Sequence, residues 1–169
     1  MLYAARTGPL TRLFRRYEIH LGAFDEPVDV EWIGFACVLI RREVVQQIGL
    51  LDEGFFMYFE DADYCRRARG AGWRIVYLPD LRVVHLLGAS SEVENQGTDL
   101  RRRPRYYYAA RTHYYHKHYG RCGLVSANLL WTFGRGISWA RELIRHKRPH
   151  TRPHEWRDIW TDSLRRLGG

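Results

Sequence analysis

One stretch, residues 55–72, constrains the fold more than any other part of the chain. Its sequence is FFMYFEDADYCRRARGAG, in which an aromatic run meets three carboxylates and is followed by arginines, alanines and glycines. Aromatic side chains favour burial whereas carboxylates need water or a partner, so this junction is expected at the edge of a hydrophobic core, where active sites occur. The helix formers after it and the glycines that close it predict a helix over 60–71. Asp61 is then expected in the first turn of that helix.

Charge is unevenly distributed along the 169 residues. Residues 1–100 contain 11 Lys and Arg against 15 Asp and Glu, a net charge of −4, whereas residues 101–169 contain 16 against 4, a net charge of +12. Six of the eight histidines also lie in the second part, which therefore gains positive charge below neutral pH. A basic, aromatic-rich segment attracts an anionic partner, either lipid headgroups or nucleic acid.

The cysteines and the apolar stretches indicate in which cellular compartment the protein is located. Cys37, Cys65 and Cys122 form no CxxC pair and are odd in number, so a reducing environment without a cysteine metal site is expected. A hydrophobic content of 46% excludes a disordered chain. The first residues lack the apolar segment of a signal peptide, and the most apolar stretch, 124–133, is too short to cross a bilayer. These features predict a cytoplasmic protein, or one that is peripheral at the inner face of the cell membrane.

Periodicity and turn residues predict the remaining elements of the first hundred residues. Strands are expected over 28–40, 73–78 and 81–87, and helices over 10–19 and 41–48. Residues 1–27 are interpreted as a connector, and the polar residues after 90 as a loop. No glycine-rich phosphate loop is present, so the usual nucleotide cradle is not expected in this chain.

Two aromatic side chains in these strands have alternative interpretations. Trp32, beside the small Gly34, is either a core aromatic at a strand edge or a surface on which a sugar stacks. His85 lies near a strand end and before a flexible turn, where it is either a ligand for a bound group or a hydrogen-bonded structural histidine.

Residues 98–169 are expected to form a basic helical extension. Six of the eleven tyrosines lie within 105–120 beside cations, a pattern that favours a membrane–water interface. A helix is expected over 124–144 with a wide apolar face. This helix either lies at a membrane interface, docks on the preceding domain or packs in an ordinary core.

Several motifs together resemble the second half of bacterial family 2 glycosyltransferases, especially rhamnosyltransferase-like enzymes of cell-surface polysaccharide synthesis. In order, they are WIG at 32–34, CVLIRREV at 37–44, LDE at 51–53, FFMYFEDAD at 55–63 and VVH at 83–85. The basic, Tyr-rich extension also resembles theirs. The resemblance implies an α/β fold, with residues 28–97 as the acceptor-side part of a GT-A nucleotide-diphospho-sugar transferase domain. The donor-binding, Rossmann-like half would precede residue 1 and is absent.

The resemblance also implies an activity and its residues. The activity is the inverting transfer of a sugar, with rhamnose as the candidate, from a nucleotide sugar to a glycan or lipid-linked glycan acceptor. Asp61 would take the proton from the acceptor hydroxyl, and Trp32, Gly34 and Glu60 would line the acceptor site. His85 would join a divalent cation, Mg²⁺ or Mn²⁺, that neutralises the departing diphosphate. A carboxylate in the first turn of a helix suits a base, because the helix dipole favours its ionised form.

The chain departs from the family pattern in its metal-binding residues. Asp61-Ala62-Asp63 has the Asp-x-Asp spacing, but residues two apart on a helix point in different directions, so one metal between them is not expected. Asp63 is interpreted as a surface charge or as a residue that supports the site. Since the family's donor half is missing, the chain is expected to be a fragment, or to obtain that half from another chain, and to have little or no transferase activity alone.

Two alternative functions compete with the transferase. One is a non-catalytic remnant that binds a membrane or a protein partner through its acidic edge and basic extension. The other is nucleic-acid binding by the Arg- and Tyr-rich extension. Nucleic-acid binding leaves residues 32–91 unexplained, so nucleic acid is not an expected partner.

Overall fold

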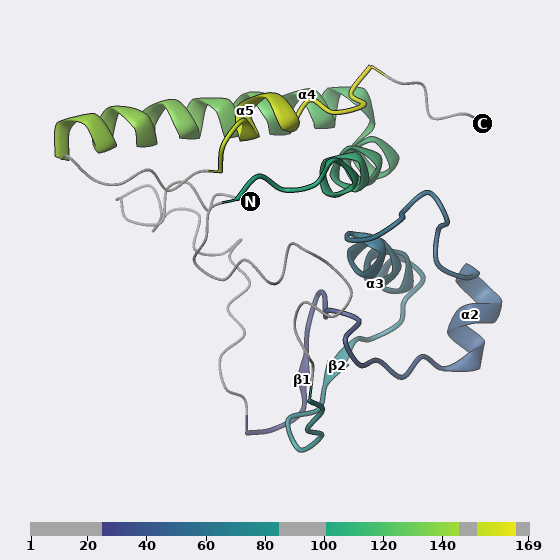
Figure 1. Cartoon of the computed structure of the whole chain (residues 1–169). Coiled ribbons are helices and arrows are strands. Elements are labelled where there is room, and N and C mark those ends of the chain that lie inside the picture. Colours follow the sequence, from purple (N-terminus) through teal and green to yellow (C-terminus); the bar gives the residue numbers. More distant parts are fainter. Residues whose placement is uncertain (1–24, 85–100, 146–151, 165–169) are drawn as a thin grey trace. The chain divides into compact units, whose positions relative to one another are not determined.

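The computed structural model describes residues 25–84, 101–145 and 152–164 (Figure 1). The chain divides into two compact units. The first, here called the α3 unit, comprises Leu21–Ser90, and the second, the α4 unit, comprises Met1–His20 and Ser91–Gly169. The helix expected over 10–19 and the candidate metal ligand His85 lie outside the described residues.

The α3 unit contains two helices and a small sheet. In chain order its elements are β1 (Val28–Asp29), α2 (Arg42–Ile48), α3 (Glu60–Gly70) and β2 (Val76–Tyr77). β1 and β2 pair antiparallel, with Val28 opposite Tyr77 and Asp29 opposite Val76. The expected helices over 41–48 and 60–71 are therefore confirmed to within one residue at each end.

The predicted strands are too long. The strands expected over 28–40 and 73–78 contain two residues each, and residues 81–84 have no regular structure. A strand persists only where a neighbour accepts its backbone hydrogen bonds, and among the described residues β1 and β2 pair only with each other. Leu39, in the middle of an apolar run, is accordingly 97% exposed.

The core of the α3 unit lies where α2 packs on α3. Val44 of α2 and Tyr64 and Ala68 of α3 are buried together, and four partly buried residues pack around them, namely Phe35, Ile40, Ile48 and Trp73. The ring of Phe35 meets that of Tyr64 edge to face, with the centroids 6.0 Å apart. The segment that carries the WIG motif thus packs against α3.

The α4 unit is built on one long, kinked helix. α4 (Arg105–Arg145) changes direction at Gly120, so that its two segments run in different directions in Figure 1. The backbone of Gly120 has φ 66° and ψ −173°, a conformation that is essentially confined to glycine. The helix expected over 124–144 is confirmed as the second segment.

A buried polar network joins the two segments of α4 to α5 (Glu155–Asp158) and the turn after it. The Arg111 guanidinium donates to the Asn128 side-chain oxygen at 2.7 Å, and the Asn128 amide donates to the Ile159 carbonyl at 3.1 Å. The Thr112 hydroxyl donates to the Thr161 carbonyl at 2.8 Å. Because buried polar groups are costly unless paired, this network fixes how the two segments of α4 and α5 pack together.

The tyrosines of α4 do not all lie on the surface. Tyr108 and Tyr115 are 1% and 5% exposed, so the interfacial position expected for the Tyr-rich segment is wrong for these two. The second segment instead exposes large apolar side chains, among them Leu129, Leu130, Phe133, Trp139, Leu143 and Ile144. No helix in the described part of the chain has both the length and the apolar character that a bilayer span requires.

Candidate functional site

The candidate site begins at a strained turn before α3. Tyr58 and Phe59 both adopt left-handed backbone conformations, with φ 71° and 68°. This conformation is uncommon for aromatic residues and costs roughly 1–3 kcal/mol at each. The strained turn leads directly into Glu60 and Asp61, the first two residues of the helix. Strained backbone of this kind is concentrated at functional sites.

Asp61 lies in the first turn of α3, as the sequence predicts, and its carboxylate is directed toward the WIG segment. Oδ1 accepts a hydrogen bond from the backbone N–H of Ala62 at 2.7 Å. Oδ2 lies 3.8 Å from the position that a Cβ would take at Gly34, so the small residue there leaves room beside the carboxylate. Burial raises the pKa of Asp61, while the Ala62 N–H and the Trp32 indole partly oppose that rise.

Two buried polar atoms near Asp61 have no hydrogen-bond partner among the described residues. They are Nε1 of Trp32 and Oε2 of Glu60. The Trp32 indole influences the pKa of Asp61, yet it lacks the geometry of a full hydrogen bond to it. Burial, and secondarily the charge of Asp61, raises the pKa of Glu60. A buried donor and a buried acceptor that lack partners are costly by themselves and are satisfied when a hydroxyl-bearing ligand binds.

Cys65 is a residue of this site that the sequence interpretation missed. It is 3% exposed, and its Sγ lies 3.8 Å from the carbonyl oxygen of Ile33, to which the thiol donates. Burial raises the pKa of the thiol. Its spacing from Asp61 could have identified it in the sequence, because residues four apart lie on one face of a helix. Cys65 thereby joins α3 to the segment that holds Trp32 and Gly34.

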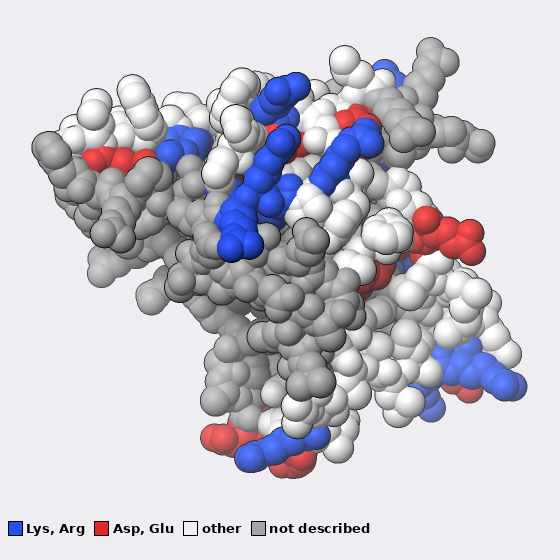
Figure 2. All heavy atoms as spheres, in the orientation of Figure 1, with Lys and Arg blue, Asp and Glu red and all other residues white. Residues whose placement is uncertain are grey.

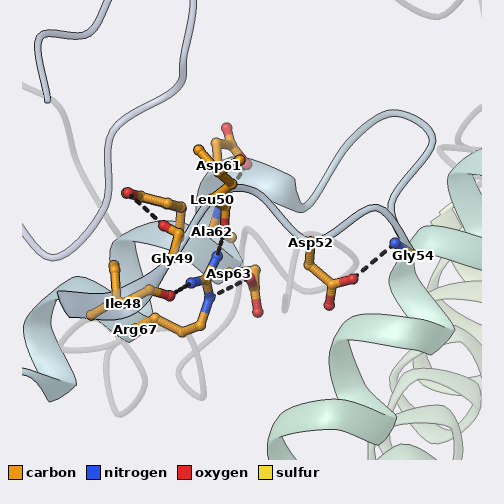
Figure 3. A network of polar contacts seen from close by, with 10 residues as sticks. Ile48, Gly49, Leu50, Asp52, Gly54, Asp61, Ala62, Asp63 and Arg67 are labelled. Carbon is orange, nitrogen blue, oxygen red and sulfur yellow. Dashed lines mark hydrogen bonds and ion pairs between the residues drawn. The ribbon is translucent and has the colours of Figure 1, made fainter. Parts of the chain in front are cut away.

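Asp63 differs from Asp61 in its surroundings and corrects a prediction. Its side chain is 0% exposed and pairs with Nε of Arg67 at 2.8 Å, so Asp63 is not a surface charge. Arg67 also donates to the carbonyls of Ile48 and Leu50 at 2.7 and 2.9 Å. Figure 3 shows Asp63 directed toward Arg67 and Asp61 directed away from it. Asp63 therefore holds the turn after α2 against α3.

The described residues bring together four of the five predicted site residues: Trp32, Gly34, Glu60 and Asp61. The fifth, His85, lies outside them. No group of three or more His, Cys, Asp or Glu that could hold a metal occurs within the described ranges.

The chain is similar to known sugar transferases in the region that contains this site. Residues 28–109 match the family described as "Glycosyltransferase like family 2". N-acetylglucosaminyl-diphospho-decaprenol L-rhamnosyltransferase of Mycobacterium tuberculosis is 45% identical over 56 residues, which are 33% of this chain and 18% of the relative. Rhamnosyltransferase WbbL of Escherichia coli is 36% identical over 56 residues, 33% of this chain and 21% of the relative.

A further relative is the dTDP-rhamnosyl transferase RfbF of Shigella flexneri. It is 26% identical over 76 residues, which are 45% of this chain and 26% of the relative. The chain thus spans about a fifth of the length of the first curated relatives that it matches. No solved structure matches the chain.

Proposed function

We propose that the α3 unit forms the acceptor side of an inverting glycosyltransferase with Asp61 as the general base, a proposal supported by the match of residues 28–109 to the glycosyltransferase-like family 2. One contrast carries this proposal. The Asp63 carboxylate is paired with Arg67, whereas no cation pairs with Asp61 among the described residues. Asp61 is instead half-buried beside Gly34 and the Trp32 indole. A carboxylate in such surroundings is available to accept a proton.

The proposed reaction assigns one step to this carboxylate. The acceptor hydroxyl gives its proton to Asp61 while its oxygen bonds to the anomeric carbon of the sugar. The bond from that carbon to the diphosphate oxygen breaks, and the nucleoside diphosphate leaves with the electron pair. The raised pKa of Asp61 makes it a stronger base than an ordinary aspartate.

Trp32 and Glu60 are proposed to position the acceptor. The Trp32 indole N–H donates to an acceptor oxygen, and Glu60 Oε2 accepts from an acceptor hydroxyl, since neither atom has a partner in the part of the chain that the structure describes. The flat face of Trp32 also suits stacking against a sugar ring. Gly34 keeps the space beside Asp61 open.

The names of the relatives support a particular donor and acceptor class. One is named a dTDP-rhamnosyl transferase, and another transfers L-rhamnose to an N-acetylglucosaminyl-diphospho-decaprenol. We propose the corresponding chemistry here, with a nucleotide-activated rhamnose as donor and a lipid-linked glycan as acceptor.

A divalent cation is a common requirement of this family, and Mg²⁺ or Mn²⁺ is the expected ion. The described residues do not assemble a set that fits it, because Asp61 and Asp63 are directed to different sides of α3 (Figure 3). No step proposed above passes through a metal. That His85 joins such an ion stays a prediction.

The experiment measures rhamnose transfer from dTDP-rhamnose to a lipid-linked N-acetylglucosamine acceptor. It compares the chain as it stands with the chain joined to the donor-binding half of the mycobacterial relative. In whichever form is active, Asp61→Asn is expected to lower kcat by roughly 10²–10⁴-fold. Asp80→Asn makes the same chemical change at an exposed position of the same unit and is expected to have no effect. Undiminished transfer by the Asp61→Asn protein would refute the assignment.

A further inference from the structure

The α4 unit contains a pocket that the proposed transfer reaction does not use. Its volume is about 820 Å³, and its walls come from residues 102–105, which lead into α4, and from residues 157, 158, 160 and 161 at and after α5. Four arginines line it, namely Arg102, Arg103, Arg105 and Arg157, together with Asp158 and Trp160. Figure 2 shows blue side chains gathered over α5 and the start of α4.

Two of these arginines are held in place by carboxylates. Arg102 forms a bidentate pair with Asp158, from Nε at 2.8 Å and from Nη2 at 2.6 Å. This pair leaves Nη1 of Arg102 outside it. Arg105 donates to Asp162 at 2.6 Å. These pairs orient the guanidinium groups before any ligand arrives, which reduces the entropic cost of binding.

The other two arginines retain unused donors. Nε of Arg103 is buried and has no hydrogen-bond partner within the described ranges, and the carboxylate of Glu155 lies 4.0 Å from Nη1. Arg157 is exposed and forms no ion pair among the described residues. The pocket therefore holds more positive charge than the carboxylates around it neutralise.

An unpartnered hydroxyl lies beside the same groups. Tyr108 is 1% exposed, and its hydroxyl has no hydrogen-bond partner in the residues that the structure describes. Burial raises the pKa of Tyr108, and the charges of Glu155, Arg103 and Asp158 also act on it. The hydroxyl thus stays protonated and is a donor close to the arginines of the pocket.

We propose that this pocket binds the phosphate or diphosphate group of a monoester. Guanidinium groups fit phosphate oxygens in paired, charge-assisted hydrogen bonds, and a phosphate group supplies the acceptors that Arg103 and Arg157 lack. Trp160, 39% exposed, provides an apolar surface for the organic part of the ester. The proposal rests on the α4 unit alone and does not depend on the reaction proposed for the α3 unit.

The phosphate group has two sources, a soluble ester or the headgroup of a membrane lipid. Calorimetry with the full chain and inorganic diphosphate as the probe tests the first. Co-sedimentation with vesicles of phosphatidylcholine and phosphatidic acid, with and without diphosphate as competitor, tests the second. If diphosphate releases the protein from the vesicles, the lipid headgroup is a ligand of the same pocket. If diphosphate binds but does not release the protein, the pocket is assigned to a soluble ester.

Arg157→Ala is the decisive variant, because this exposed side chain pairs with no carboxylate among the described residues and its removal leaves the fold intact. It is expected to weaken diphosphate binding about tenfold or more, as the loss of a hydrogen bond to a charged group does. Arg121→Ala removes another exposed arginine, on α4 and outside the pocket, and is expected to change binding less than twofold. Circular dichroism confirms that both variants are folded.

Three results would overturn the proposal. One is an absence of diphosphate binding by the full chain at low salt. Another is an equal loss of binding in the Arg157→Ala and Arg121→Ala proteins, since that would indicate general electrostatic attraction rather than a built pocket. The third is binding that Arg157→Ala leaves unchanged.

Discussion

Asp61 and Asp63 are identical in type and two residues apart, yet their surroundings give them different roles. Arg67 holds Asp63, while burial raises the pKa of Asp61 above its usual value of 3.8. Since Asp61 must be ionised to act as a base, kcat/KM is expected to fall as the pH drops through the raised pKa. The acid limb of the profile should therefore lie at a higher pH than an ordinary aspartate would give. The measurement is the pH dependence of rhamnose transfer by the chain alone or by the chain joined to the donor-binding half, whichever is active.

The same pKa shift predicts an effect on stability. A carboxyl group whose pKa is raised in the folded state contributes stability at low pH, and this contribution is lost as the pH rises from 3.8 through the raised value. Asp61→Asn should consequently leave the free energy of unfolding at pH 7 unchanged or increase it. A strongly destabilised Asp61→Asn protein would indicate a structural role instead.

Two of the ion pairs of the α3 unit, Arg67–Asp63 and Arg74–Asp29, should differ in their contributions to stability. Arg67→Met leaves Asp63 buried without its cation and removes two hydrogen bonds to the turn after α2, so a loss of about 3–5 kcal/mol is expected. Arg74→Met breaks the exposed pair with Asp29, which water screens, and should cost far less. Urea denaturation followed by circular dichroism measures both. Similar losses for the two variants would contradict this ranking.

For the candidate site, the motifs and the helix period predicted which residues the structure places near one another; their roles stay predictions. Trp32, Gly34, Glu60 and Asp61 follow from the motifs, and the period of the helix would also have identified Cys65. Arg67 could not be assigned in this way, because its carbonyl partners in 48–50 lie outside α3 and are reached only through tertiary packing.

Among the elements, helices were predictable and strands were not. α2 and α3 form their hydrogen bonds within their own segments, so local pattern and terminal glycines were sufficient. β1 and β2 each depend on a partner strand distant in sequence. The longer strands were predicted from apolar character alone, and they have no partner strand among the described residues. The kink of α4 was also missed, because a helix was expected only over 124–144 and not across Gly120.

Gly120 is expected to be indispensable to the shape of α4. Its backbone conformation is strained for any residue with a Cβ, so Gly120→Ala should cost roughly 1–3 kcal/mol and weaken the contact of Arg111 with Asn128. Gly134→Ala lies in the same helix, has no atoms within 4 Å of a new Cβ and should stabilise the protein by about 0.5–1 kcal/mol. Thermal unfolding measures both changes. Equal effects would mean that the kink is not required.

For the molecule as a whole, the second part of the chain combines a high positive charge with exposed apolar side chains. Residues 101–169 carry a net charge of +12, and α4 exposes Leu129 and Phe133 one turn apart, at 57% and 70%. Cations next to an apolar helix surface are typical of segments that bind anionic membranes. We therefore propose an anionic membrane surface as a partner of the α4 unit.

Vesicle binding tests this partner. The full chain should co-sediment with vesicles of phosphatidylcholine and phosphatidylglycerol, and Phe133→Gln should weaken binding about tenfold, because burying a phenylalanine contributes about 1.5–3 kcal/mol. Leu81→Gln, at an exposed leucine of the α3 unit, is the matched control and should have no effect. Single-stranded DNA offers the same charge without an apolar phase, so binding to DNA should be weaker at equal salt and insensitive to Phe133→Gln. Equal binding to DNA and vesicles, unaffected by Phe133→Gln, would instead favour a nucleic-acid partner.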